Sequence, residues 1–170
     1  MALFIAFTLN AQERETIWPK KKMPNSQEHQ IAAMTNETSA KGFKADKHRI
    51  AYLDWYNAPS EETKNGGCMI LISGGSYECC CDVGYIKRWS EEFTKLGFQC
   101  VNFVYRTPRP VGLPIYQTAW EDGQRAVRMI RSEAEKRGFD PEKIGVISKG
   151  SYVKCSITSF LTRTSLSDLK

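Results

Sequence analysis

The sequence predicts an α/β fold with three layers, in which helices flank a mostly parallel sheet. Two continuous apolar runs, residues 68–73 and 144–147, are typical of strands that are buried on both faces. Two segments with apolar residues at helical spacing, residues 83–97 and 115–138, lie between these runs. Because strands that alternate with helices usually pair in parallel, this order favours a layered sheet with a helix on each face.

Shorter patterns predict the remaining elements. Residues 48–56 and 98–105 are rich in aromatic and β-branched side chains, which favours strands. Gly97 and Gly138 follow the two helical segments, where glycine commonly ends a helix. Residues 152–162 form a weaker helix candidate, because their β-branched residues lower the helix propensity.

The composition is that of a soluble globular domain. The chain has 170 residues, enough for one domain with a core, and 41% of them are apolar. The net charge of +5 hints at an anionic partner, but no RNA-binding or helix-turn-helix signature is present, so we expect no nucleic acid. We also expect no cofactor and no metal, because the cysteine spacing matches no common zinc pattern and both histidines lie far upstream.

The chain divides into three parts. Residues 1–11 form an apolar segment that ends at small residues, as a secretory signal does. The positive residues that usually begin such a signal are missing, which leaves two interpretations, a clipped start or a misassigned one. This segment is too short to span a bilayer, and the alternative is a buried first strand. Residues 12–47 read as an extended arm, and residues 48–170 as a partial domain. A signal segment predicts a secreted or periplasmic protein.

The cysteines leave two interpretations open. Adjacent cysteines bond to each other only with strain, so a disulfide in an exported chain is expected to join one of them to a distant partner. The alternative is a set of reduced, small apolar residues packed near a turn. The six cysteines are Cys68, Cys79, Cys80, Cys81, Cys100 and Cys155.

Two loops at the carboxyl ends of apolar strands are candidates for a functional site, because ligands bind at this edge of open α/β sheets. The first, residues 72–77, contains a Gly-Gly pair whose backbone N–H groups can approach a ligand closely. The second contains Ser148, with Gly150 two residues after it and Val146 two residues before it. A serine on a tight turn after a strand is where some hydrolases hold their nucleophile, and the alternative is a structural turn.

Part of the chain resembles the amino-terminal half of an α/β-hydrolase esterase of the acetyl-xylan-esterase-like and lipase-like kind. Three stretches carry the resemblance: "MILISGGSY", "NFVYRTPRP" with the long helix that leads into "KIGVI", and "SKGSY". The resemblance covers residues 48–160. It implies a serine hydrolase that acts on a small ester or a carbohydrate ester. By the same resemblance Ser148 is the catalytic nucleophile, and the backbone N–H groups of Gly75, Ser76 and Lys149 stabilise the oxyanion.

The sequence departs from this family at two points. Ser148 takes the nucleophile position only with a two-residue gap, and without that gap the position holds Gly150. The family order is serine, acid, histidine, whereas His29 and His48 both precede Ser148. We therefore expect this chain to be a truncated, weakly active or inactive hydrolase. The alternatives are a degenerate hydrolase-like protein, a ligand-binding protein without catalysis, or a base from the early strand at His48.

Overall fold

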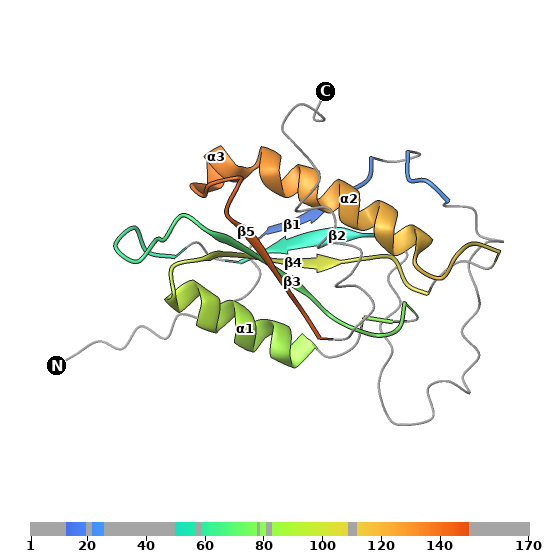
Figure 1. Cartoon of the computed structure of the whole chain (residues 1–170), viewed down its shortest axis with the longest axis horizontal. Helices are drawn as coiled ribbons and strands as arrows, with labels where there is room; N and C mark the ends of the chain where they lie inside the picture. Colours follow the sequence, from blue (N-terminus) through green and yellow to red (C-terminus); the bar gives the residue numbers. More distant parts are fainter. Residues whose placement is uncertain are drawn as a thin grey trace.

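The computed structural model describes residues 13–19, 22–25, 50–56, 59–77, 79–80, 83–108 and 112–149. Figure 1 shows a central sheet with helices above and below it. The predicted signal segment at residues 1–11 and the helix candidate at residues 152–162 lie outside the described residues. No helix among the described residues is long and apolar enough to cross a membrane.

Five strands form one sheet in the order β1-β2-β4-β3-β5. The two parallel pairings, β4 with β3 and β3 with β5, contain the elements that the apolar runs predict. This order puts β5 at one edge of the sheet and β1 at the other. The strands are β1 (Glu13–Thr16), β2 (Tyr52–Trp55), β3 (Cys68–Ile72), β4 (Gln99–Val104) and β5 (Ile144–Ser148).

The prediction of a mostly parallel sheet is wrong in part, because the sheet is mixed. β2 pairs antiparallel with both β1 and β4. A parallel neighbour needs a crossover connection, usually through a helix. The connection from Trp55 to Cys68 is short and its described residues contain no helix, so the chain reverses there and enters β3 in the opposite direction.

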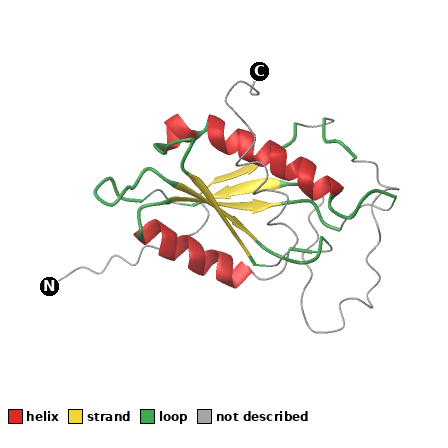
Figure 2. Ribbon diagram, in the orientation of Figure 1, coloured by secondary structure: helices red, strands yellow, loops and turns green. Residues whose placement is uncertain are grey.

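Helices cover both faces of the sheet, as the sequence predicts. α1 (Val83–Lys95) lies on one face, and α2 (Gln117–Ser132) with α3 (Ala134–Arg137) lies on the other, as Figure 2 shows. The second predicted helix is divided at Glu133, which separates α2 from α3. Gly138 ends α3 in a left-handed conformation with φ of 70°, which glycine adopts without a steric cost.

The two faces of the sheet bury separate apolar clusters. The cluster on the face toward α2 is the larger of the two. Successive side chains along each strand point to opposite faces and so join the two clusters in turn. Ile70, Ile72, Val101 and Phe103 belong to the α2 side, whereas Leu71 packs with Ile86 of α1 on the opposite side. These clusters hold β3 and β4 rigidly at the centre of the domain.

The predicted arm contains a strand that the sequence does not reveal. β1 pairs along the whole of β2, and most of its side chains are exposed. The Arg14 guanidinium donates two hydrogen bonds to the Asp54 carboxylate, at 2.6 and 2.8 Å, which fixes β1 on β2. A four-residue edge strand of charged side chains has no apolar alternation, so pattern analysis does not find it.

Candidate active site

The register of β3 and β5 brings the two predicted loops together. Ile72, the last residue of β3, pairs with Ser148, the last residue of β5. Because the strands are parallel, the Gly-Gly segment after Ile72 and the segment after Ser148 leave the sheet at the same edge. Ser148 therefore lies at the edge of the sheet from which the Gly-Gly segment leaves.

The Gly-Gly loop is tightly folded. The Gly75 φ of 152° is one that other residues rarely adopt, and a Cβ atom there would lie 1.9 Å from the Cys79 carbonyl oxygen. The Cys79 N–H donates to the Gly75 carbonyl at 3.2 Å, which closes the turn. Ser76 and Tyr77 both have positive φ, at 53° and 65°. Two consecutive non-glycine residues in this region store backbone strain, a feature that clusters at functional sites.

The backbone N–H groups of the two loops differ in whether they already have a hydrogen-bond acceptor. The Gly74 N–H donates to the Tyr85 hydroxyl at 3.2 Å. The Lys149 N–H points to the Ile72 carbonyl oxygen at 3.4 Å, so it extends the sheet pairing by one residue. No described residue accepts a hydrogen bond from the N–H groups of Gly75 or Ser76. These two predicted oxyanion donors are therefore the better placed of the three.

Ser148 ends a strand rather than standing on a turn. It is the last residue of β5, and the described residues with positive φ do not include it. Its Oγ atom is inaccessible to solvent and has no hydrogen-bond partner among the described residues. The strand therefore runs through Ser148, whereas the nucleophile of the expected motif stands on a turn. Gly150 itself lies outside the described residues.

Tyr85 of α1 links the two loops. Its hydroxyl accepts the Gly74 N–H, and the Lys149 ammonium lies 4.7 Å from the centroid of its ring. The ring also packs edge-on against Trp89, with centroids 4.6 Å apart. A cation over an aromatic face is attracted by the ring quadrupole. Tyr85 thus holds the segment after β3 and the segment after β5 against the start of α1, a role that sequence reasoning missed.

A buried thiol lies beside this edge. The Cys80 S–H donates to the Tyr105 carbonyl oxygen at 3.8 Å, and the Tyr105 hydroxyl donates to the Ser73 carbonyl oxygen at 3.4 Å. Burial raises the pKa of the Cys80 thiol to about 11, against the smaller opposing effect of hydrogen bonds such as that from Ser73. A thiol with so high a pKa is protonated at neutral pH, so Cys80 is a structural group rather than a nucleophile.

The cysteines divide into two kinds. Cys79 is disulfide-bonded, whereas Cys68, Cys80 and Cys100 are buried free thiols. Burial raises the pKa of Cys100 to about 11 and also raises the pKa of Cys68. These three buried thiols match the alternative of reduced, small apolar residues that pack in the fold. Cys81 and Cys155 lie outside the described residues.

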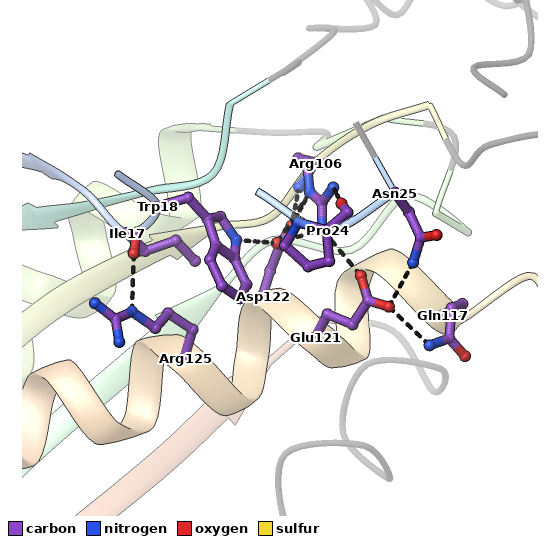
Figure 3. A network of polar contacts seen from close by, with 9 residues as sticks. All are labelled: Ile17, Trp18, Pro24, Asn25, Arg106, Gln117, Glu121, Asp122 and Arg125. Carbon is purple, nitrogen blue, oxygen red and sulfur yellow. Dashed lines mark hydrogen bonds and ion pairs between the residues drawn. The ribbon is translucent and has the colours of Figure 1, made fainter. Parts of the chain in front are cut away.

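A buried ion pair anchors the corner between β4 and α2. The Asp122 carboxylate accepts hydrogen bonds from the Arg106 backbone N–H at 2.9 Å and from the Arg106 Nε atom at 2.9 and 3.0 Å. The Trp18 indole N–H donates to the same carboxylate at 2.7 Å, and Arg106 also donates to the Pro24 carbonyl oxygen, as Figure 3 shows. Burial raises the pKa of Asp122, and the hydrogen bonds and charge of Arg106 oppose that rise.

This network fixes the arm to the domain. It joins residues 18 and 24 to residues 106 and 122, and the Arg125 guanidinium adds a hydrogen bond to the Ile17 carbonyl oxygen at 3.0 Å. The described part of the predicted arm is therefore a packed component of the fold. No signal in the sequence singles out Arg106 or Asp122 from the other charged residues, because the partners are far apart along the chain.

The fold resembles that of two solved hydrolases over part of their length. The structure resembles an acetyl ester-xyloside bifunctional hydrolase from Caldicellulosiruptor lactoaceticus with a TM-score of 0.53 and 18% identity, over 84% of this chain and 44% of that one. It also resembles the butyrate-bound Est2 esterase from Thermogutta terrifontis with a TM-score of 0.50 and 18% identity, over 59% of this chain and 36% of that one. The resemblance predicted from the sequence is thus confirmed at the level of the fold.

The sequence comparisons point to one curated relative. An 89-residue segment, 51% of this chain, is 35% identical to Endo-1,4-beta-xylanase B from Butyrivibrio fibrisolvens. This chain spans 14% of that relative and less than half of the solved esterase chains. No family model matches the chain.

Proposed function

We propose that the carboxyl edge of β3 and β5 is the substrate-binding edge of a serine hydrolase that acts on carboxylic esters, and that Ser148 is its nucleophile. The observation that carries this proposal is the parallel register of the two strands, which sets Ile72 opposite Ser148. The strained loop at Gly75 and Ser76 then lies beside the serine, where backbone N–H groups can meet a developing oxyanion.

The proposed reaction needs three groups: a nucleophile, a base and oxyanion donors. The serine oxygen attacks the ester carbonyl, a base takes the hydroxyl proton, and the two N–H groups stabilise the oxygen that becomes negative. As the bond to the alkoxide breaks, the base gives this proton to the alkoxide, which departs as the alcohol and leaves the acyl group on the serine. Water, whose proton the same base takes, then attacks the acyl carbonyl, the carboxylic acid departs, and the serine oxygen regains its proton. The fold neighbours include an esterase and an acetyl ester-xyloside hydrolase, which supports carbohydrate or other small esters as the substrate class.

The scheme requires a base, and no described residue is assigned to that role. The sequence holds two histidines, His29 and His48, and both precede Ser148. The Ser148 Oγ atom is also inaccessible to solvent in this structure. We therefore expect negligible turnover of a chromogenic acetate ester by the 170-residue chain, and no labelling by a fluorophosphonate probe. Robust turnover that is lost in Ser148→Ala and in His48→Ala would instead identify His48 as the base.

Binding tests the oxyanion edge without requiring turnover. Butyrate is a suitable probe because its carboxylate resembles the product of ester hydrolysis. We expect butyrate to shift the backbone amide resonances of Gly75 and Ser76 in a nitrogen-15 NMR titration, because these N–H groups have no acceptor among the described residues. The amide of Gly112, another glycine with positive φ, is the internal control. Shifts absent from the Gly75 loop would count against the proposal.

A substitution separates the two candidate positions of the nucleophile. Gly150→Ser places a hydroxyl where the ungapped register expects one, and Ser148→Ala removes the existing hydroxyl. If Ser148 is the nucleophile, Ser148→Ala abolishes fluorophosphonate labelling in the presence of imidazole, both with the native Gly150 and with Gly150→Ser. If labelling appears in Gly150→Ser and persists in the double variant with Ser148→Ala, the nucleophile position is 150 and the assignment of Ser148 is wrong.

A further inference from the structure

The α1 face of the sheet is covered less completely than the α2 face. Among the described residues α1 is the one helix on its face, as Figure 2 shows, and it packs on β3 and β4. Only three side chains of the apolar cluster there are fully buried, whereas seven stay partly exposed, among them Trp89 and Phe93. Apolar area that stays open in this way is typical of a surface that contacts another molecule.

Three large apolar side chains form a strip along the exposed side of α1. Trp89, Phe93 and Leu96 follow one another at a spacing that places them on one side of a helix. Leu96 comes directly after α1, and its N–H still donates to the carbonyl oxygen four residues earlier, at 3.2 Å, so it continues the last turn. Leu96 is 63% exposed. Trp89 and Phe93 are half-buried, although Trp89 already packs against the Tyr85 ring.

A row of charged side chains runs beside the apolar strip. Arg88, Glu92 and Lys95 each precede a residue of the strip by one position, so they share its spacing and lie along one side of it. The Lys95 ammonium lies 3.3 Å from the Glu92 carboxylate, and both side chains are largely exposed. Arg88 is exposed and has no ion-pair partner among the residues that the structure describes. The row thus carries a positive charge one helical turn before its negative charge.

This order of charges fits a second copy of the same helix that runs in the antiparallel direction. Around a two-fold axis near residues 90 and 91, Arg88 of each copy lies opposite Glu92 of the other. The same axis sets Trp89 of each copy against Phe93 of the other, so one arrangement satisfies the charged and the apolar pairs together. A parallel arrangement would instead set Arg88 against Arg88 and Glu92 against Glu92, and like charges in contact repel.

We propose that this strip of Trp89, Phe93 and Leu96, flanked by Arg88 and Glu92, is the interface through which two copies of this chain associate. Two α1 helices packed in this way enclose apolar side chains at the centre and keep ion pairs at the rim, as protein interfaces usually do. A contact made by one helix on each side is small, below about 1,200 Å² of total buried area, so we expect a reversible dimer with micromolar or weaker affinity. The inference does not depend on the proposed hydrolase function.

Sedimentation velocity of the whole chain at increasing concentration measures this association. We expect the average mass of the wild type to rise toward that of a dimer as the concentration approaches about 300 µM. Leu96→Ser should weaken the association constant by about fivefold, because it removes an apolar contact of the strip without opening the core. Ile50→Ser is the matched control, because Ile50 is 53% exposed outside the strip and should leave the association unchanged.

An exchange of charges tests the antiparallel register itself. Arg88→Glu and Glu92→Arg should each weaken the association by about tenfold, because each sets like charges against each other across the two-fold axis. An equimolar mixture of the two variants should associate again, because each copy then meets opposite charges at both positions. Circular dichroism melts of every variant separate lost association from lost folding.

A wild-type chain that stays monomeric over the whole concentration range would overturn the inference. Association that Arg88→Glu leaves unchanged, or a mixture that associates no better than its two components, would also overturn it. A mass that grows beyond that of a dimer without limit would show aggregation in place of a two-fold interface, and would count against the inference in the same way.

Discussion

Arg106 and Asp122 form a fully buried ion pair in which the backbone and the guanidinium of one residue both donate to the carboxylate of the other. The pair joins the end of β4 to the first turns of α2, and through Trp18 it also fixes the arm. The ion pair thus connects β4, α2 and the arm, although neither Arg106 nor Asp122 is an expected catalytic residue.

Asp122→Ala should therefore destabilise the fold strongly. The substitution leaves the Arg106 charge buried without its main partner, which costs about 3–5 kcal/mol of the free energy of unfolding. Urea denaturation followed by circular dichroism measures this change. Glu92→Ala is the control, because it removes an exposed partner of Lys95 and should cost about 0–1 kcal/mol. Equal stabilities of the two variants would contradict the role of the buried pair.

Gly75→Ala should destabilise the Gly-Gly loop more than Gly112→Ala does. Both glycines have positive φ, but a Cβ atom at Gly75 would meet the Cys79 carbonyl oxygen, whereas nothing lies within 4 Å of a Cβ atom at Gly112. The Gly112 variant thus carries the conformational cost of about 1–2 kcal/mol without the clash. Thermal melts compare the two, and a melting temperature for Gly75→Ala at or above that of Gly112→Ala would argue against the tight loop.

Tyr85→Phe should loosen the link between the two loops. The substitution removes the hydroxyl that accepts the Gly74 N–H and keeps the ring that lies near the Lys149 ammonium. We expect hydrogen–deuterium exchange at the Gly74 amide to become faster, with a loss of about 0.5–1.5 kcal/mol of protection. Tyr116→Phe, at an exposed tyrosine, should leave that exchange rate unchanged. Unaltered exchange in Tyr85→Phe would show that this hydrogen bond does not hold the loop.

The free energy of unfolding should fall as the pH rises above 9. Burial raises the pKa of the Cys80 thiol to about 11, well above the value of about 8.5 for an unperturbed thiol. In this window the folded state binds more protons than the unfolded state, so stability is full below the unfolded pKa and is lost as pH rises through the folded one. Cys100 and Tyr56, whose pKa values burial also raises, act in the same direction.

Urea midpoints at pH 8 and pH 10.5 measure this dependence. Cys80→Ala should reduce the difference between the two midpoints, because one of the titrating groups is gone. A midpoint that stays constant or increases with pH would contradict the burial of these groups.

Much of the central sheet could be predicted from the sequence, because β3 and β5 are rich in apolar side chains and β4 in aromatic and β-branched ones, as strands are. The antiparallel edge could not be predicted in the same way. β1 is a short strand of exposed side chains, and its position depends on Arg14 meeting Asp54 across forty residues of chain. The local sequence pattern does not indicate a contact between residues so far apart in the chain.

The residues of the candidate site also divide into those that the sequence indicates and those that it does not. The loop at Gly75 follows an apolar strand and Ser148 ends another, so both could be located from the sequence, and the parallel register places them at one edge. The roles of Tyr85 and Asp122 depend on contacts between distant segments, with a backbone N–H at Gly74 and with the Arg106 guanidinium. The sequence does not indicate which distant group a tyrosine such as Tyr85 or an aspartate such as Asp122 will contact.

Chemical rescue by imidazole tests the central claim most directly, because it supplies the base that the chain does not place after Ser148. The measurement is the rate of hydrolysis of a chromogenic acetate ester at increasing imidazole concentration, after subtraction of the protein-free rate. We predict a protein-dependent rate that saturates with ester concentration and is lost in Ser148→Ala, while Ser132→Ala, at an exposed helix position, retains it. A rate that is the same in Ser148→Ala as in the wild type would contradict the assignment of this edge as a serine hydrolase site.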